Sequence, residues 1–400
     1  MFSELKSITA VGAKAKALSA IWTFPSIIFS ALVIGWAAEA AQFLLSQGLA
    51  LAILAWLQTL PEFAVEAVIA WEAGIDPEKV HLITANFTGS LRLLVGLAWP
   101  MIYFTAAFFR KMKPGEKRFI GIRLEGEHAC EVMGLLPPIS YFVIIVLKGT
   151  LTLFDSAILI LMYASYLYFL KKIPPQDQEK IEDAAKVPRR ILKMKPVPRG
   201  LSITALFLIG GFWLYFVAHP FLYSMLALAA LLGVSNFVFV QWVAPFLSEF
   251  PEKVTAFNWA RTVRKAPMGL MNMVSSNINQ WTVLVAMIPI VYSFSRGEIS
   301  VVHFDAHQKT EILLTMAQSA LGFLLLANME FRWHEALGLF ALWFTQLCFP
   351  EWREEITFVY LAWIVLELGL ASLGRKRLKA FGEFKVLAAR FVFKSERSYH

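Results

Sequence analysis

The sequence predicts an all-α membrane protein made of two inverted five-helix repeats, with broken helices at the midplane, plus one extra C-terminal helix. Three observations lead to this prediction. Of 400 residues, 58% are hydrophobic and 16% are charged, against roughly 25% charged in ordinary globular proteins. Eleven apolar segments approach the ~20 residues that a spanning helix needs. Short motifs of the first half also recur in the second half.

The first half is expected to hold five spans followed by a polar linker. Glu39 lies inside the first span, and Pro61 interrupts the second. The expected spans are approximately residues 21–45, 49–71, 82–108, 132–147 and 151–170. We expect residues 171–199 to form a cytoplasmic linker whose middle, residues 176–186, is a short surface helix.

The second half is expected to hold six spans. Residues 201–246 carry no Asp, Glu, Lys or Arg and are long enough for two helices, the second of which continues through Pro251. The other expected spans are approximately residues 268–294, 312–327, 333–349 and 357–373. The predicted units are therefore a first repeat (1–170), the linker (171–199), a second repeat (200–350), and an extra helix with a basic tail (351–400).

The charges fit a multi-pass protein of the cell membrane. The net charge of +8 comes from basic residues clustered in a few polar loops, which is the positive-inside pattern. This pattern predicts the lipid bilayer as partner, no nucleic acid, and an N-terminus outside the cell. Two cysteines, Cys130 and Cys348, do not make a disulfide framework or a cysteine metal site. The chain has no zinc-protease or serine-hydrolase motif, so we expect neither an enzyme nor a bound cofactor.

Two motifs recur in register. Glu62 and Glu252 follow prolines and are 190 positions apart, while Pro100 and Pro289 are 189 apart. An odd number of spans per copy makes the two copies run in opposite directions through the membrane. In transporters with this plan, the binding site lies at the midplane, between interrupted helices of the two halves.

The two Pro-Glu pairs predict a site for small inorganic cations. A charge in the bilayer core costs ~2.5–3.5 kcal/mol, so Glu62 and Glu252 are expected to face a cavity or a partner. Each proline frees a backbone carbonyl one turn back. Carbonyl and carboxylate oxygens are hard ligands that suit Ca²⁺ or Na⁺. The alternative is a pair of kinked helices whose glutamates are protonated or hydrogen-bonded for structural reasons.

Amides and hydroxyls near these glutamates are further candidates. Ser276 and Gln280 are favoured as ion ligands. The others suit either ion binding or interhelical hydrogen bonds, worth ~0.6 kcal/mol each on average in a membrane. These are Gln58, Thr59, Asn86, Thr88, Ser90, Ser248, Asn272, Ser275, Asn277 and Asn279.

Four further charged residues bear on the site. Lys253 is expected to pair with Glu249 at i, i+4, which leaves Glu252 free. Glu66, one turn after Glu62, is a second ligand, a proton carrier or the partner of a basic residue. Arg92 is expected to neutralise Glu62 or Glu66 and so to stand where a cation would otherwise sit.

These motifs resemble those of the cation/calcium antiporter superfamily, the sodium/calcium exchangers and their relatives. Thr59-Leu60-Pro61-Glu62 and Glu249-Phe250-Pro251-Glu252 are similar to the acidic motif of each family repeat. Residues 85–90 and 272–277 are similar to the second, amide-rich motif. Gln58 and Glu249 replace a family threonine and serine, and the last carboxamide of the second motif is Leu94 in one copy and Gln280, or Asn279 in a shifted register, in the other.

The resemblance implies a secondary active antiporter that exchanges Ca²⁺ against H⁺ or Na⁺ by alternating access. Glu62 and Glu252 would be the central, metal-binding ligands. The implied accessory oxygens are those of Thr59, Ser90, Ser248, Ser276 and Gln280, with Gln58, Glu66, Asn86, Arg92, Glu249 and Asn277 as modulators. The alternative is a non-transporting or regulatory membrane protein on the same scaffold, its site locked by Arg92.

Overall fold

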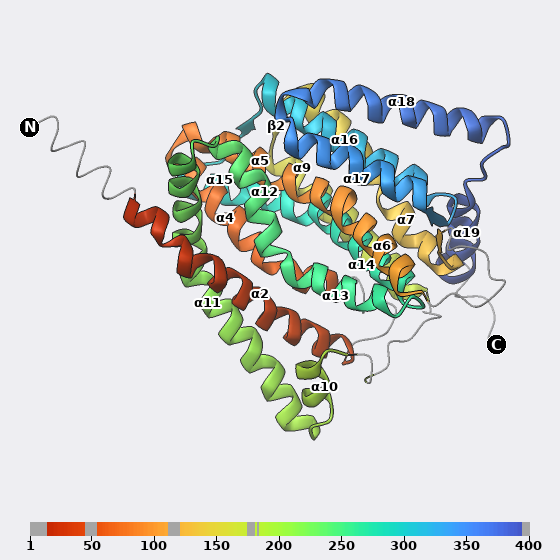
Figure 1. Cartoon of the computed structure of the whole chain (residues 1–400), viewed down its shortest axis with the longest axis horizontal. Coiled ribbons are helices and arrows are strands. Elements are labelled where there is room, and N and C mark those ends of the chain that lie inside the picture. The colour runs from red at the N-terminus through yellow and green to blue at the C-terminus, as the bar shows by residue number, and fades with distance from the viewer. Residues whose placement is uncertain (1–13, 45–53, 111–120, 174–180, 182–183, 394–400) are drawn as a thin grey trace, which may run out of the picture.

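The computed structural model describes residues 14–44, 54–110, 121–173, 181 and 184–393, and these residues are almost entirely helical (Figure 1). Within them, eight helical segments are long and apolar enough to cross a membrane. The other three predicted spans are shorter or interrupted: α4 (Leu60–Ile75), α12 (Asn236–Ser248) with α13 (Phe250–Arg261), and α17 (Trp333–Cys348). The prediction of a multi-pass, all-helical membrane protein is confirmed.

The helices of the first half follow the predicted spans but are divided more finely. The third predicted span contains a π-helix, η2, between α5 and α6, and the fourth divides at Leu135. The helices besides α4 are α2 (Ala20–Gln42), η1 (Pro77–Lys79), α5 (Val80–Leu93), η2 (Leu94–Ala98), α6 (Trp99–Phe109), η3 (Gly126–His128), α7 (Ala129–Gly134), α8 (Leu136–Lys148) and α9 (Leu153–Lys172).

The second half begins with the linker helix α10 (Lys186–Leu192), which starts where the predicted surface helix ends. Most of that predicted helix lies outside the described residues. The remaining helices are α11 (Pro196–Leu232), α12, α13, α14 (Ala266–Asn279), η5 (Gln280–Leu284), α15 (Val285–Arg296), α16 (Ala306–Leu326), α17, η6 (Pro350–Trp352), α18 (Arg353–Ser372), α19 (Lys379–Leu387) and η7 (Ala388–Phe393).

Prolines set the two breaks that position the site. Pro61 and Pro251 each stand in the first turn of a helix, where the missing N–H costs nothing. The chain turns at Thr59 before α4 and at Glu249 before α13. Glu62 and Glu252 consequently lie in the first turns of α4 and α13, where the helix dipole favours negative charge.

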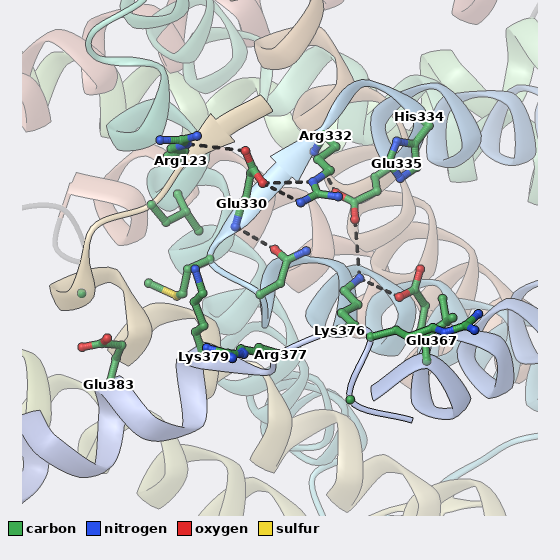
Figure 2. Close-up of a pocket in the computed structure, with 17 residues that line it drawn as sticks. Arg123, Glu330, Arg332, His334, Glu335, Glu367, Lys376, Arg377, Lys379 and Glu383 are labelled. Carbon is green, nitrogen blue, oxygen red and sulfur yellow. Dashed lines mark hydrogen bonds and ion pairs between the residues drawn. The ribbon is translucent and has the colours of Figure 1, made fainter. Parts of the chain in front are cut away.

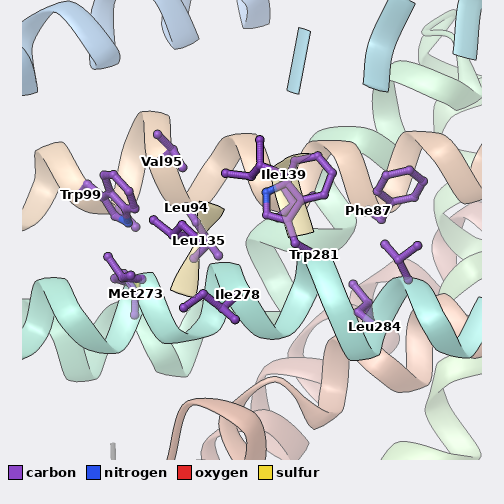
Figure 3. Packing of buried hydrophobic residues seen from close by; sticks show 14 of the residues in the cluster. Phe87, Leu94, Val95, Trp99, Leu135, Ile139, Met273, Ile278, Trp281 and Leu284 are labelled. Carbon is purple, nitrogen blue, oxygen red and sulfur yellow. The ribbon is translucent and has the colours of Figure 1, made fainter. Parts of the chain in front are cut away.

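The two amide-rich helices lie side by side and run in opposite directions. Figure 3 shows α5 and η2 above α14 and η5, with residue numbers that increase in opposite senses along the two helices. Phe87, Leu94 and Trp99 face Met273, Ile278 and Trp281 across a buried apolar interface. Antiparallel packing of equivalent helices is what an inverted repeat requires.

Two short antiparallel ribbons join the halves. In one, β1 (Gly121–Arg123) pairs with β4 (Glu330–Arg332); in the other, β2 (Thr150–Leu151) pairs with β3 (Val302–His303). Each ribbon links the loop after the third predicted span of one half to the loop after the fourth span of the other. Exchanging the two halves therefore turns one ribbon into the other, as an inverted repeat requires.

Helices α2 and α11 form a packed pair at the edge of the bundle (Figure 1). Their buried hydroxyls Thr23 and Ser224 are hydrogen-bonded at 2.7 Å. Glu39, near the end of α2, accepts a 2.7 Å hydrogen bond from the backbone N–H of Ala185 in the linker. Glu39, the carboxylate inside the first apolar segment, therefore binds the linker to α2 by a hydrogen bond.

Gly89 allows α5 and α12 to touch. A Cβ atom at this position would overlap the backbone carbonyl of Gln241. The close contact brings the Gln241 side chain onto α5, where its Nε2 lies 3.4 Å from Thr88 Oγ1. We therefore expect Gly89 to be required for the packing of the two helices.

Gly89→Ala is expected to lower the thermal unfolding midpoint and the yield of monodisperse protein, because overpacking a core costs about 1–3 kcal/mol. The measurement is fluorescence-monitored unfolding of the purified protein in detergent. The matched control is Gly211→Ala on α11, where no atom lies within 4 Å of the added methyl group. Equal midpoints for the two variants would contradict the proposed packing role.

Candidate functional site

Four buried glutamates meet at the two helix breaks. Glu62 and Glu66 lie one turn apart on α4, Glu249 lies between α12 and α13, and Glu252 lies in the first turn of α13. All four side chains are fully buried. Glu62 is within electrostatic range of the other three. The structure thus brings together the two acidic motifs, which are far apart in the sequence.

Glu62 and Glu249 share two partners. Gln280 Nε2 lies 2.7 Å from Glu62 Oε2 and 2.8 Å from Glu249 Oε1. The Ser90 hydroxyl also contacts both carboxyl groups. An amide NH₂ has two hydrogens and can donate to both groups, but a hydroxyl has only one. The Ser90 hydroxyl can therefore donate to only one of the two carboxyl groups at a time.

Lys253 pairs with Glu249 at i, i+4, as predicted. This pair places the positively charged ammonium group of Lys253 beside Glu249 and not beside Glu62. The charge of Glu249 is thus compensated by Lys253, whereas Glu62 forms no ion pair with any described residue.

Glu252 differs from Glu62 in having no donor. Neither of its carboxylate oxygens has a hydrogen-bond partner, although Ser276 lies beside it. The sequence paired Glu62 with Glu252, whereas the structure joins Glu62 to Glu249 through Ser90 and Gln280 and places Glu252 beside Ser276.

The other predicted residues lie around this centre. Glu66 accepts a 2.5 Å hydrogen bond from Asn86, and Thr59 accepts one of 2.6 Å from Asn279. Gln280, and not Asn279, therefore contacts Glu62. The remaining contacts are those of Gln58 with Thr255 (3.3 Å) and Asn272 (3.4 Å), of Ser248 with the Ala244 carbonyl (2.9 Å), and of Asn277 with the Leu91 carbonyl (3.5 Å).

Many buried oxygens here lack a donor. Most buried side-chain oxygens in proteins are hydrogen-bonded, so a group of buried oxygens without a donor calls for an explanation. On α4, α5, α13, α14 and η5, the unpaired acceptors are Glu66 Oε1, Thr84 Oγ1, Asn86 Oδ1, both Glu252 carboxylate oxygens, Asn272 Oδ1, Ser276 Oγ, Asn277 Oδ1, Asn279 Oδ1 and Gln280 Oε1. Oxygens without donors are suitable ligands for a hard cation.

The described residues contain no group of three or more His, Cys, Asp or Glu side chains placed to hold a metal ion together. The glutamates lie close enough to interact electrostatically but do not converge on one point. A cation at this centre would therefore take most of its ligands from amide and hydroxyl oxygens, with carboxylates supplying the charge.

The prediction that Arg92 neutralises Glu62 or Glu66 is wrong. The guanidinium group of Arg92 points away from them and forms a 2.5 Å ion pair with Glu311 on α16. It also donates to Gln346 Oε1 at 3.2 Å. Because this pair uses the charge of Arg92, the arginine does not lock the site, and the alternative built on that lock loses its basis.

Glu311 was not identified from the sequence. It is fully buried, forms a second ion pair with Arg353 at the start of α18, and accepts a 3.0 Å hydrogen bond from Gln241 on α12. The node formed by Arg92, Glu311 and Arg353 ties α5, α16 and α18 together. The signal for it was Arg92 itself, because a buried arginine in an apolar helix needs an acidic partner.

The fold and the site define a multi-pass membrane protein with a buried acidic centre between two inverted halves. The family model "Sodium/calcium exchanger protein" matches residues 15–172 and 202–350, and the chain belongs to this family, as the motifs indicated. It is therefore a member of the cation/calcium antiporter superfamily.

Solved structures agree with this assignment. "Crystal Structure of H+/Ca2+ Exchanger CAX" is 32% identical, with a TM-score of 0.83, over 96% of this chain and 95% of that one. "Structure of native YfkE" (15% identity, TM-score 0.56, 85% and 97% coverage) shares the fold. So does the sodium-calcium exchanger NCX_Mj soaked with Na⁺ and Sr²⁺ (18%, 0.51, 85% and 98%). Among curated protein sequences, none matches this chain.

Proposed function

We propose that this protein exchanges Ca²⁺ for H⁺ by alternating access, with Glu62 and Glu252 as the charged ligands. The observation that carries the proposal is the pair of buried carboxyl groups, Glu62 and Glu249, that share Ser90 and Gln280 as partners, because two such groups so close together favour taking up a proton. The solved structure that is 32% identical is an H⁺/Ca²⁺ exchanger, which supports the same counter-ion.

Coupling follows from competition for the same oxygens. When Glu62 carries a proton, its carboxyl group is neutral and is held by Ser90 and Gln280. A divalent cation needs the ionised carboxylate, so its arrival expels the proton. Ser90 and Gln280 can then rotate their oxygens toward the cation, while Glu252, which has no donor to release, supplies a second charge. One site thus holds either a proton or Ca²⁺, and not both.

Reconstituted liposomes test the counter-ion. We expect an acidic interior to drive uptake of radioactive Ca²⁺, and we expect nigericin, which dissipates the pH gradient, to abolish this uptake. An outward Na⁺ gradient at equal pH should give no uptake above that of protein-free liposomes. Uptake driven by Na⁺ and insensitive to nigericin would rule out H⁺ as the counter-ion, and no uptake under either gradient would rule out exchange.

A further inference from the structure

A polar cavity lies where α17 begins and α18 ends. None of the four glutamates of the candidate site lines it. It measures about 800 Å³ and is bordered by the β1–β4 ribbon and by α19 (Figure 2). A volume of this size suits a small ligand and not a polymer. The family match ends at residue 350, so the segment that supplies most of the basic side chains of the cavity lies beyond it.

The chain folds back to build this cavity. Gly374 adopts a positive φ of 69° at the end of α18, and the backbone N–H of Arg375 bonds the Leu370 carbonyl at 2.9 Å. The tail is then anchored by a 3.0 Å bond from the N–H of Ala380 to the carbonyl of Ala327, at the end of α16. As a result, the run from Arg375 to Lys379 borders the cavity and does not extend away from the protein.

Most of the acidic groups in the cavity are already paired. Glu330 pairs with Arg332 at 2.9 Å and with Arg123 at 3.6 Å. Lys376 lies between Glu335 and Glu367, at 3.5 and 2.6 Å (Figure 2).

Three basic side chains have no such partner. Arg375, Arg377 and Lys379 line the cavity, are exposed, and form no ion pair with any described residue. Glu383 is the remaining acidic group on the lining. The unpaired groups therefore leave an excess of positive charge in a concave, partly open space, where it attracts an anion more strongly than on a flat surface.

We propose that this cavity binds a phosphate-bearing anion through Arg375, Arg377 and Lys379. The planar guanidinium group matches two phosphate oxygens at once, and lysine adds a point charge. Basic clusters that directly follow a membrane helix bind anionic headgroups. Beside the cavity, α19 exposes Phe381 and Val386, as a helix at a membrane surface does. The phosphate can therefore come from a lipid headgroup or from a soluble molecule.

Direct binding measurements on the full-length protein in neutral detergent test this site independently of transport. One arm is calorimetric titration with inorganic pyrophosphate. The other is native mass spectrometry with phosphatidic acid, compared with phosphatidylcholine. The test variant is Arg377→Gln with Lys379→Gln. The matched control, Lys385→Gln with Arg390→Gln, removes the same charge from the same tail outside the cavity lining.

We expect saturable binding of at least one probe, weakened about tenfold or more in the test variant and about twofold or less in the control. Thermal unfolding should be unchanged in both variants, because all four side chains are exposed. Binding of pyrophosphate alone, or of phosphatidic acid alone, supports the site and identifies the source of the phosphate. Equal weakening in both variants, or no saturable binding to the wild type, overturns the proposal.

Discussion

Replacing Glu62 by glutamine is expected to reduce proton-driven Ca²⁺ uptake by about 100-fold or more. The amide keeps the shape of the side chain: its oxygen can still accept from Gln280 while its NH₂ group donates to the Ser90 hydroxyl, so the fold should survive. It cannot ionise, however, and thus resembles the proton-loaded state permanently. Losing one charged contact to a buried partner costs about 2–5 kcal/mol, and every 1.4 kcal/mol is about a tenfold change.

Glu252→Gln should cause a similar loss, although no donor holds that carboxylate in the structure. Both variants are measured by initial uptake into liposomes at matched protein density. Glu298→Gln, on an exposed loop residue that is outside the site, serves as the control and should retain wild-type uptake. Wild-type flux in either test variant would remove that glutamate from the proposed ligand set.

The second large effect is expected at Glu311. Glu311→Gln leaves the buried guanidinium group of Arg92 beside Arg353, with no carboxylate between them. Breaking a buried ion pair in this way costs about 3–5 kcal/mol, because one charge stays buried without compensation. We expect a clear fall in the thermal unfolding midpoint of the purified protein.

A double-mutant cycle separates this effect from a general sensitivity of α16. Arg92→Gln combined with Glu311→Gln should lose less stability than the sum of the two single variants, because the pair is removed together. Glu354→Gln, an exposed residue on α18, should leave the midpoint unchanged. Strict additivity of the two single effects would show that the ion pair contributes nothing.

Much of the architecture could be read from the sequence, because a bilayer imposes long apolar helices. The amide-rich motifs were also informative, since polar side chains in such helices must meet something. What the motifs did not reveal was which glutamates share partners. Glu249 was expected to pair with Lys253 and to modulate the site, whereas the structure also joins it to Glu62 through Ser90 and Gln280.

Glu311 escaped prediction for a different reason. The ninth span was expected to start at residue 312, where the apolar run begins. The helix in fact starts at Ala306, because Asp305 and Gln308 form a capping box. This polar first turn places Glu311 inside the bundle. Its partner Arg92 lies 219 positions away, and hydrophobic periodicity carries no information about such a distant pair.

Two of the three π-helices in the described residues, η2 and η5, carry information about the relation between the two halves. Each starts four residues after the final serine of its motif, η2 after Ser90 and η5 after Ser276. Such turns are rare, at well under 1% of residues, and arise when one residue is inserted into an α-helix. The same insertion at the same register in both halves is more simply inherited once than acquired twice. The shared register of η2 and η5 therefore supports a common origin for the two halves.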